Sequence, residues 1–389
     1  VSASVTGSDR GPEMNRRRVL FAGYAPVHFL CFRPVYERLR TDPDLELWLS
    51  GGFRSKDDQG VESYSLDGFY DPFGVDTERV IPFERAAGEA WDVAICAHTS
   101  RGLLPERTAR SVQIFHGVSF KNFAVRDKVL GFDLLCIPGS YHTERFRSQG
   151  LMQTEQARFL LTGFPKTDRL VEPGFDRAAL LGAEGLDPAR PTVLYAPTGG
   201  KNNSLETVGE EVVRAIAADG RWNLMVKPHD HPKRKIDWFE RLATLEGPTT
   251  RVVRGLDVVD YLLTADLLLT DASSVAIEYT LLDRPLVFID VPKLLKNVVR
   301  RGAPLDLVTH GRKIGALATG AEEVVAEIER GLAEPQNRAD LRRTTARDVF
   351  HEPGGATERV AEVVRFAAGL RTDLPADIET LQALSLIHI

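Results

Sequence analysis

Residues 265–282 read ADLLLTDASSVAIEYTLL, and this stretch indicates the fold of the chain. The apolar run Leu267–Thr270 has the length and composition of a buried strand, and the residues from Ser274 to Leu282 follow a helical pattern. Small hydroxyl residues join the two, as they do where a strand of a parallel sheet leads into its helix. The stretch therefore predicts one strand–helix unit of an α/β protein.

The same alternation continues in both directions. The strands expected in the first half are Arg18–Ala22, Leu45–Ser50, Val93–Ala97, Val112–Phe115, Leu134–Pro138 and Phe159–Thr162. Those expected in the second half are Thr192–Tyr195, Trp222–Lys227, Thr250–Arg254, Leu267–Thr270 and Leu286–Ile289. Helical patterns lie between them, at Arg33–Arg40, Ser204–Ala218, Asp237–Leu245, Val258–Ala265, Ser274–Leu282 and Ala321–Leu332. This order predicts parallel sheets.

A Pro- and Gly-rich stretch, residues 166–190, separates the two runs of strands and predicts an interdomain connection. We therefore expect an N-terminal Rossmann-like domain over 14–165 and a C-terminal, nucleotide-binding one over 191–349. Residues 1–13 are expected to be a disordered extension and 371–389 a tail. By fold analogy, a helix within 350–370 packs back on the N-terminal domain.

Composition narrows the classes of function. The chain has 389 residues, 43% of them hydrophobic, which suffices for two cores. Its net charge of −6 argues against nucleic acid as the main partner. Cys31, Cys96 and Cys136 lie in apolar runs and are expected to be reduced, as in a cytoplasmic protein. No stretch reaches the roughly 20 apolar residues of a membrane span.

Ligands of open α/β sheets bind beyond the carboxyl ends of the strands, so the residues just after each strand matter most. His116 and Gly117 follow the strand that ends at Phe115, and Lys121 comes four residues later. Imidazole titrates near working pH, so His116 is a candidate general base, and Lys121 a candidate anion contact. The alternative for His116 is a structural histidine bonded to a backbone carbonyl.

Basic residues follow the strand that ends at Lys227. His229 and His231 are joined there by Lys233, Arg234 and Lys235, a cationic group in an acidic protein. Such a group favours an anionic ligand such as a diphosphate, with Lys227 and His229 as the contacts. For Lys233, Arg234 and Lys235 themselves we favour the other interpretation, a solvated helix start. No acid or cysteine clusters with the two histidines, so we expect no metal site.

The residues that follow two further predicted strands favour the binding of a phosphate group. Ser273 and Ser274 open a helix whose backbone N–H groups and dipole attract anions, although the same serines are ordinary helix caps. Asp271 precedes them, and Glu278 lies one turn on and is a candidate for ribose hydroxyls. The loop Thr198–Lys201 contains two glycines that permit a close approach to a ligand, or simply form a flexible turn.

Taken together, these motifs resemble the CDP-glycerol glycerophosphotransferase family of teichoic-acid polymerases and primases. The family's H-G-x-x-x-K, G-[YF]-P-[RK]-x-D-x-L, L-Y-A-P-T, K-x-H and T-D-x-S-S elements are matched in order, with a late G-x-A-x-x-R-like element. The matching residues are His116, Gly117, Lys121, Gly163–Lys166, Asp168, Leu170, Leu194–Thr198, Lys227, His229, Thr270, Asp271, Ser273, Ser274, Glu278 and Gly354–Arg359.

The resemblance implies a GT-B fold that binds a CDP-activated alditol in a cleft between its two parallel-sheet domains. An acceptor hydroxyl, on a glycan or a lipid-linked molecule, would attack the β-phosphorus and release CMP. His116 would be the base, and His229 a second catalytic residue. Thr198, Lys201, Lys227, His229, Asp271, Ser273, Ser274 and Glu278 would bind the nucleotide and its diphosphate, while Lys121 and Gly117 would face the acceptor or a phosphate.

The sequence requires no cofactor and does not indicate Mg²⁺. It agrees with a cytoplasmic enzyme that associates loosely with the inner face of the membrane. Two alternatives stay open. One is a nucleotide-sugar enzyme on the same fold, either a glycosyltransferase or a UDP-N-acetylglucosamine 2-epimerase. The other is a catalytically idle binding or scaffold protein, although the presence of His116 counts against it.

Overall fold

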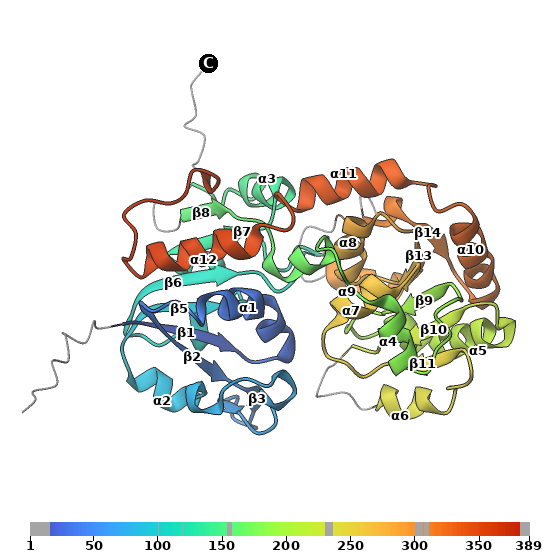
Figure 1. Cartoon of the computed structure of the whole chain (residues 1–389), viewed down its shortest axis with the longest axis horizontal. Helices are drawn as coiled ribbons and strands as arrows, with labels where there is room; N and C mark the ends of the chain where they lie inside the picture. The colour runs from blue at the N-terminus through green and yellow to red at the C-terminus, as the bar shows by residue number, and fades with distance from the viewer. Residues whose placement is uncertain are drawn as a thin grey trace, which may run out of the picture.

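The computed structural model describes residues 16–99, 101–118, 120–153, 158–229, 236–299, 306 and 311–381. Within these ranges the chain forms two lobes, each built on a sheet with helices packed against it (Figure 1). The first sheet has the strand order β15-β8-β7-β6-β5-β1-β2 and the second the order β11-β10-β9-β12-β13-β14. Two Rossmann-like halves of a GT-B fold are thus confirmed.

Successive side chains in the strands of the first sheet point to opposite faces of the sheet. The sheet consists of β1 (Arg17–Gly23), β2 (Leu45–Gly51), β5 (Trp91–Cys96), β6 (Thr108–Ile114), β7 (Leu134–Ile137), β8 (Arg158–Leu161) and β15 (Glu379–Leu381). In β1, Val19 and Phe21 belong to one buried cluster, whereas Leu20 and Ala22 belong to another. Both faces are covered, which is why the predicted strands read as continuous apolar runs.

The second sheet is parallel throughout its described strands. It consists of β9 (Thr192–Tyr195), β10 (Asn223–Val226), β11 (Thr250–Val252), β12 (Leu267–Thr270), β13 (Leu286–Ile289) and β14 (Ala316–Ala318). Strand β9 lies between β10 and β12, so the chain reverses its direction of strand addition there. Such a switch point opens a crevice at the carboxyl ends of the strands.

The helices are amphipathic segments that cover these sheets. They are α1 (Pro26–Leu39), α2 (Phe83–Gly88), α3 (Ser140–Ser148), α4 (Arg177–Ala183), α5 (Glu210–Asp219), α6 (Trp238–Ala243), α7 (Val258–Thr264), α8 (Val275–Glu278), α9 (Pro292–Val299), α10 (Ala321–Ala333), α11 (Ala339–Val349) and α12 (Ala356–Ala367). None of the described helices is long and apolar enough to cross a membrane.

Some elements differ from expectation. Helix α1 begins at Pro26, seven residues before the predicted start at Arg33, because proline is well tolerated in the first helical turn. The hairpin β3 (Phe53–Lys56) and β4 (Glu62–Ser65) was not predicted. Strand β15 pairs antiparallel with β8, which corrects the prediction that 371–389 is only a tail. The predicted extension 1–13 lies outside the described residues.

Helix α12 returns to the N-terminal lobe, as the sequence analysis expected of the final helix. It packs against α1, and its N-terminus is capped by Asp168, from the short helix η5 (Pro165–Leu170). The Asp168 carboxylate accepts hydrogen bonds from the backbone N–H groups of Gly354, Ala356 and Thr357 at 3.0, 3.2 and 2.7 Å. A carboxylate at this position satisfies the unpaired donors and suits the helix dipole.

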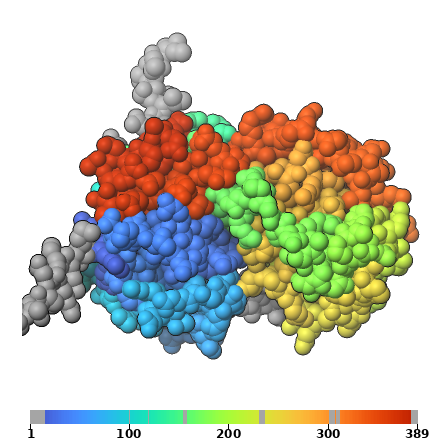
Figure 2. Space-filling view, in the orientation of Figure 1, coloured from blue at the N-terminus to red at the C-terminus, as the bar shows by residue number. Residues whose placement is uncertain are grey.

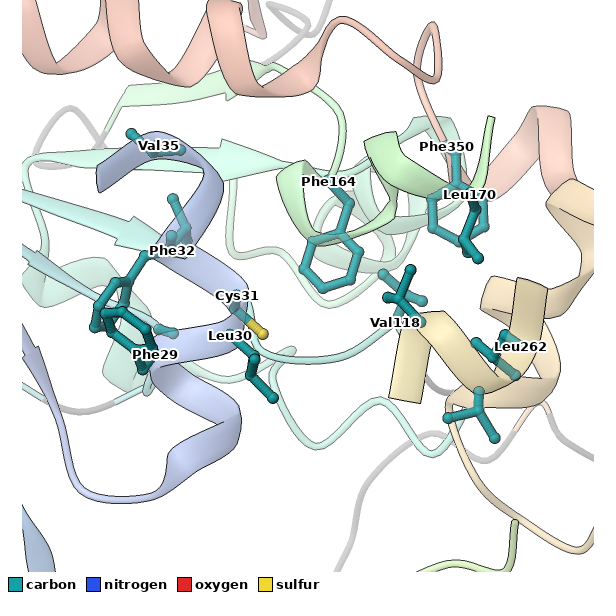
Figure 3. Close-up of a cluster of buried hydrophobic side chains, with 14 of the residues drawn as sticks. Phe29, Leu30, Cys31, Phe32, Val35, Val118, Phe164, Leu170, Leu262 and Phe350 are labelled. Carbon is teal, nitrogen blue, oxygen red and sulfur yellow. The ribbon is translucent and has the colours of Figure 1, made fainter. Parts of the chain in front are cut away.

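One buried cluster connects the two lobes. Phe164 and Leu170, at either end of η5, lie between Leu30 of α1 on one side and Leu262 of α7 on the other (Figure 3). Figure 2 shows the η5 segment at the junction of the lobes, in contact with both. This apolar continuity fixes the walls of the cleft that holds the candidate site.

Candidate functional site

A cavity of about 380 Å³ opens between the lobes, at the carboxyl ends of strands from both sheets. Tyr24 follows β1, His116 follows β6, Pro197 follows β9, Lys227 follows β10 and Ser273 follows β12, and all of them line it. We call Tyr24–Val27, Arg54, Lys56 and His116 the N-side wall. Pro197, Lys227–His229 and Ser273–Val275 form the C-side wall.

His116 is half-buried on the N-side wall, and its ring is held by one defined hydrogen bond. Its Nδ1 lies 2.9 Å from the carbonyl oxygen of Ala97. A carbonyl can only accept, so Nδ1 carries the proton and Nε2 of the neutral ring is left as a proton acceptor. The backbone bond that the sequence analysis treated as the alternative to catalysis is thus the feature that orients a base.

Two further histidines and a tyrosine surround this base. His28, from α1, has its ring centroid 5.1 Å from that of His116 and 5.9 Å from that of His98. Tyr24 packs edge-on against His28 and His98, with centroids 4.5 and 4.6 Å away. Burial, followed by the nearby His116 and His98, lowers the pKa of His28 well below its usual value. His28 is therefore a neutral packing partner for the base at neutral pH.

Burial also lowers the pKa of His116. The hydrogen bond to Ala97 opposes that effect, and the positive charge of Lys166 adds to it. Both lowering causes disfavour the imidazolium, because one removes water from it and the other repels it. His116 is thus unprotonated, and able to accept a proton, throughout the neutral range.

Lys166 forms a buried ion pair at the floor of the cavity. Its Nζ lies 2.8 Å from Oε2 of Glu278, with the side chains 6% and 0% exposed. Burial is the largest single influence and opposes protonation, but the charge of Glu278, its hydrogen bond to Lys166 and the effects of Cys31 and Asp257 together raise the pKa of Lys166. The pair joins η5 to α8 across the lobes and keeps an ammonium group beside the reaction space.

Glu278 therefore has a different role from the one that we predicted. Its carboxylate is engaged with Lys166 and does not line the cavity. The prediction that it accepts ribose hydroxyls is corrected on this geometry, because a carboxylate that is fully buried beneath the floor is out of a ligand's reach. Its other oxygen, Oε1, is buried and has no hydrogen-bond partner among the described residues.

Asp271 is likewise a positioning residue. It is fully buried and accepts hydrogen bonds from the backbone N–H groups of Thr198 and Ser204 at 2.8 and 2.9 Å, and from the Ser204 hydroxyl at 2.9 Å. It holds the 196–204 loop against the start of α8. We correct its predicted contact with the nucleotide to this organising role.

The other predicted residues divide into two groups. Lys227, His229, Ser273 and Ser274 line the cavity beside His116, whereas Gly117, Lys121, Thr198 and Lys201 lie outside the lining. Lys121 donates from Nζ to Thr198 Oγ1 at 3.0 Å, a contact between the lobes. Gly117 faces Ser274, whose hydroxyl lies 3.6 Å from where a Cβ would stand. Lys201 is exposed.

The C-side wall offers donors of the kind that a diphosphate needs. Lys227 is only 5% exposed, and its ammonium group lies 5.8 Å from the Phe239 ring centroid. Ser273 and Ser274 are half-buried at the start of α8. The remaining basic residues that we singled out, His231, Lys233, Arg234 and Lys235, lie outside the described residues. No group of three or more metal-ligating side chains occurs in the described ranges.

The absence of a side chain at Gly199 leaves room for the His229 ring, which gives a prediction. A Cβ at Gly199 would lie 2.9 Å from Cγ of the His229 ring, closer than real Cβ contacts come. Gly199→Ala is therefore expected to turn His229 away and to lower donor turnover by up to about 10²-fold, as misplaced catalytic groups do. Because His229 is an exposed side chain and not part of a buried core, thermal stability should change little. Steady-state kinetics and a melting curve check both.

Gly182→Ala is the matched control, since nothing lies within 4 Å of a Cβ at that helical position. Unchanged kinetics for Gly199→Ala would show that His229 has no role in the reaction.

Five polar or charged residues of the N-side wall and its support were not predicted from the sequence: Tyr24, His28, Arg54, Lys56 and His98. Tyr24 and His98 follow strands that were correctly predicted, so attention to every strand end would have found them. His28 lies in α1 but before the predicted start of that helix at Arg33, and Arg54 and Lys56 belong to the unpredicted hairpin.

A cleft between two Rossmann-like sheets, with an oriented histidine on one wall and a buried lysine and serines on the other, defines a nucleotide-dependent transferase of the GT-B type. The chain belongs to the CDP-Glycerol:Poly(glycerophosphate) glycerophosphotransferase family, whose model matches residues 97–365. The resemblance seen in the sequence motifs is confirmed, and every cavity-lining residue that was predicted falls within this range.

Two curated proteins of Bacillus spizizenii are similar to the chain. The teichoic acid ribitol-phosphate primase is 23% identical over 364 residues, 86% of each chain. The teichoic acid glycerol-phosphate primase is 26% identical over 197 residues, 46% of this chain, and the match spans about half (49%) of that relative.

Solved structures share the fold. The wall teichoic acid polymerase TagF has a TM-score of 0.65 at 17% identity, covering 91% of this chain and 90% of that one. The S. aureus protein MnaA with UDP has a TM-score of 0.57 at 14% identity, covering 94% and 100%.

Proposed function

We propose that this protein transfers an alditol phosphate, of the glycerophosphate type, from a CDP-activated donor to an acceptor hydroxyl in the synthesis of a cell-envelope polymer. The observation that carries the proposal is the position of His116, whose Nδ1 is tied to Ala97 while its ring borders the cavity. Support comes also from the family and from a structure of a TagF variant soaked with CDPG, which matches with a TM-score of 0.64.

The reaction requires a proton acceptor near the acceptor hydroxyl. In the proposed mechanism, Nε2 of His116 takes the hydroxyl proton while the oxygen forms a bond to the β-phosphorus. The bond from that phosphorus to the bridging oxygen breaks, and CMP leaves with the electron pair. Because Nδ1–H stays bonded to a carbonyl, the imidazolium that forms is partly stabilised by that dipole.

The reaction also requires that the negative charge of the donor diphosphate be neutralised. Lys227 and the serines at the start of α8 line the C-side wall, where they would hold the donor phosphates. Lys166 lies at the floor between this wall and His116, so its ammonium group would neutralise charge that builds on the transferred group. Positioning and neutralisation of this kind account for most of the catalysis of phosphoryl transfer.

The lowered pKa of His116 sets the expected pH dependence. A base works in its neutral form, so activity is lost as pH falls through the pKa. We expect kcat/KM to stay constant from pH 8 down to the ordinary histidine value of about 6.5 and to fall only below it. A pH–rate profile measures this. An acid limb centred well above 6.5 would contradict the assignment.

A calorimetric screen of CMP, CDP, CDP-glycerol, UDP and UDP-N-acetylglucosamine tests the proposal directly. Preferential binding of the cytidine nucleotides, followed by release of CMP when an acceptor is added, is the expected result. Preference for uridine nucleotides would overturn it and favour the nucleotide-sugar enzyme, whose fold is shared by MnaA.

We place the acceptor on a glycan or lipid-linked molecule, and the reaction in the cytoplasm at the inner face of the membrane.

A further inference from the structure

We propose that Lys121 is a positioning residue, which fastens the loop that begins with His116 to Thr198 on the opposite lobe and so holds the base in its working position. We call residues 116–118 and 120–122 the base loop. The inference rests on the proposed function, because it assigns a further residue to the same reaction. Lys121 does not line the cavity, so its contribution is an indirect one.

At its start the base loop is held by its own lobe. It follows β6, an inner strand of the first sheet, and Nδ1 of His116 lies 2.9 Å from the carbonyl oxygen of Ala97. That hydrogen bond orients the ring. How far the ring reaches toward the C-side wall depends also on the backbone that follows, and therefore on what holds the rest of the loop.

Lys121 holds the loop to a fixed point of the C-terminal lobe. Its Nζ donates a hydrogen bond to Oγ1 of Thr198 at 3.0 Å. Thr198 is 5% exposed, its backbone N–H donates to Asp271 at 2.8 Å, and its carbonyl accepts from the Asn203 side chain at 2.6 Å. Asp271 also accepts from the backbone N–H of Ala272, directly before the serines that open α8. The anchor of Lys121 is thus fixed to the proposed phosphate contacts.

The neighbours of Lys121 reach the same lobe. The buried side chain of Asn122 donates to Oδ2 of Asp306 at 3.2 Å, and the backbone N–H of Asp306 donates to the Phe120 carbonyl at 2.9 Å. Asp306 belongs to the segment between α9 and the short helix η8 (Gly311–Ile314). Gly117, directly after the base, faces Ser274 of α8. The base loop therefore belongs to one lobe by sequence and to the other by its contacts.

The alternative role for Lys121 is a direct contact with a substrate phosphate. Its place outside the cavity lining and its bond to Thr198 favour positioning. The two roles differ in what can be measured. A direct contact would act without Thr198 and would change the affinity for the donor. Positioning acts through Thr198 and lowers the rate, because a misplaced base slows the chemical step while the donor still binds.

The first test is a double-mutant cycle with Lys121→Met and Thr198→Val. CMP release from saturating CDP-glycerol, with glycerol as the hydroxyl probe, gives the rate, and calorimetry with CDP gives the affinity. We expect each single variant to lower the rate by about 10- to 10²-fold at unchanged affinity. The double variant should lose no more than the larger single loss, because both changes remove one bond. Thr198→Ser, which keeps the hydroxyl, should retain most of the rate.

Hydrogen exchange tests the inference without relying on turnover. In the full chain, Lys121→Met and Thr198→Val should each speed exchange in the peptide covering residues 112–122 by about 3- to 10-fold, because the loop opens more often once the bond is lost. Arg169→Met is the matched control. Arg169 lies 2.9 Å from Asp257 and joins η5 to the start of α7, outside the base loop. It should leave both the exchange and the rate unchanged.

Unchanged exchange in Lys121→Met would overturn the inference, as would losses of rate that multiply in the double variant. Weaker affinity for CDP in Lys121→Met would show that its ammonium group binds the donor and does not position the base. A wild-type protein that releases no CMP, while its base loop loosens in Lys121→Met, would overturn only the proposed function.

Discussion

Replacing His116 by alanine is expected to lower the transfer rate by about 10²- to 10⁴-fold, the usual contribution of a general base. Affinity for CDP and CDP-glycerol should remain nearly unchanged, because His116 lies on the N-side wall and the proposed phosphate contacts lie on the other. Single-turnover kinetics and calorimetry on the same preparation measure the two quantities separately.

His351→Gln is a suitable control, since that histidine is partly exposed and lies outside the cavity. A collapse of nucleotide affinity in His116→Ala would show that the imidazole binds the donor and is not the base. A retained transfer rate would show that another residue is the base, and His229 would be the next candidate.

Replacing Glu278 by alanine is expected to destabilise the protein by about 3–5 kcal/mol, because it leaves the Lys166 ammonium group buried without a counter-ion. Chemical denaturation of the wild-type and variant proteins measures this. The exposed pair of Arg221 with Glu329 supplies the control. Its nitrogen–oxygen distance of 2.7 Å is as short, yet Glu329→Ala should leave the stability nearly unchanged, because solvent screens an exposed pair.

A double variant separates stability from function in this pair. Lys166→Met with Glu278→Leu removes both charges and should regain most of the lost stability, because apolar side chains of similar size tolerate burial. It should not regain transfer, since it lacks the Lys166 ammonium group that we propose neutralises the transferred phosphate. A stable double variant with full activity would exclude Lys166 from the mechanism.

The strands and their ends were predictable because they depend on local pattern. The runs Thr192–Tyr195, Leu267–Thr270 and Leu286–Ile289 coincide with β9, β12 and β13, and the parallel arrangement brings their carboxyl ends to one edge. That rule alone placed His116, Lys227 and the Ser273–Ser274 pair around one cavity.

What the sequence did not reveal depends on tertiary contacts. The segments of the β3–β4 hairpin, FRSK and ESYS, are short and polar, so no apolar alternation marked them. Glu278 looked like a ligand residue because helical spacing put it near Ser274. Its actual partner, Lys166, lies 112 positions away in the sequence, and no local pattern encodes that pair.

The Asp168 cap on α12 has a practical consequence for anyone who divides this enzyme into fragments. The N-terminal lobe is not one continuous piece of polypeptide, because its surface is completed by Val360, Val363 and Val364, which are encoded after the whole C-terminal lobe. A fragment that ends near residue 190 would expose the apolar surface that these valines cover and would be prone to aggregate. Joining the α12 segment to that fragment through a linker is the design that this topology recommends.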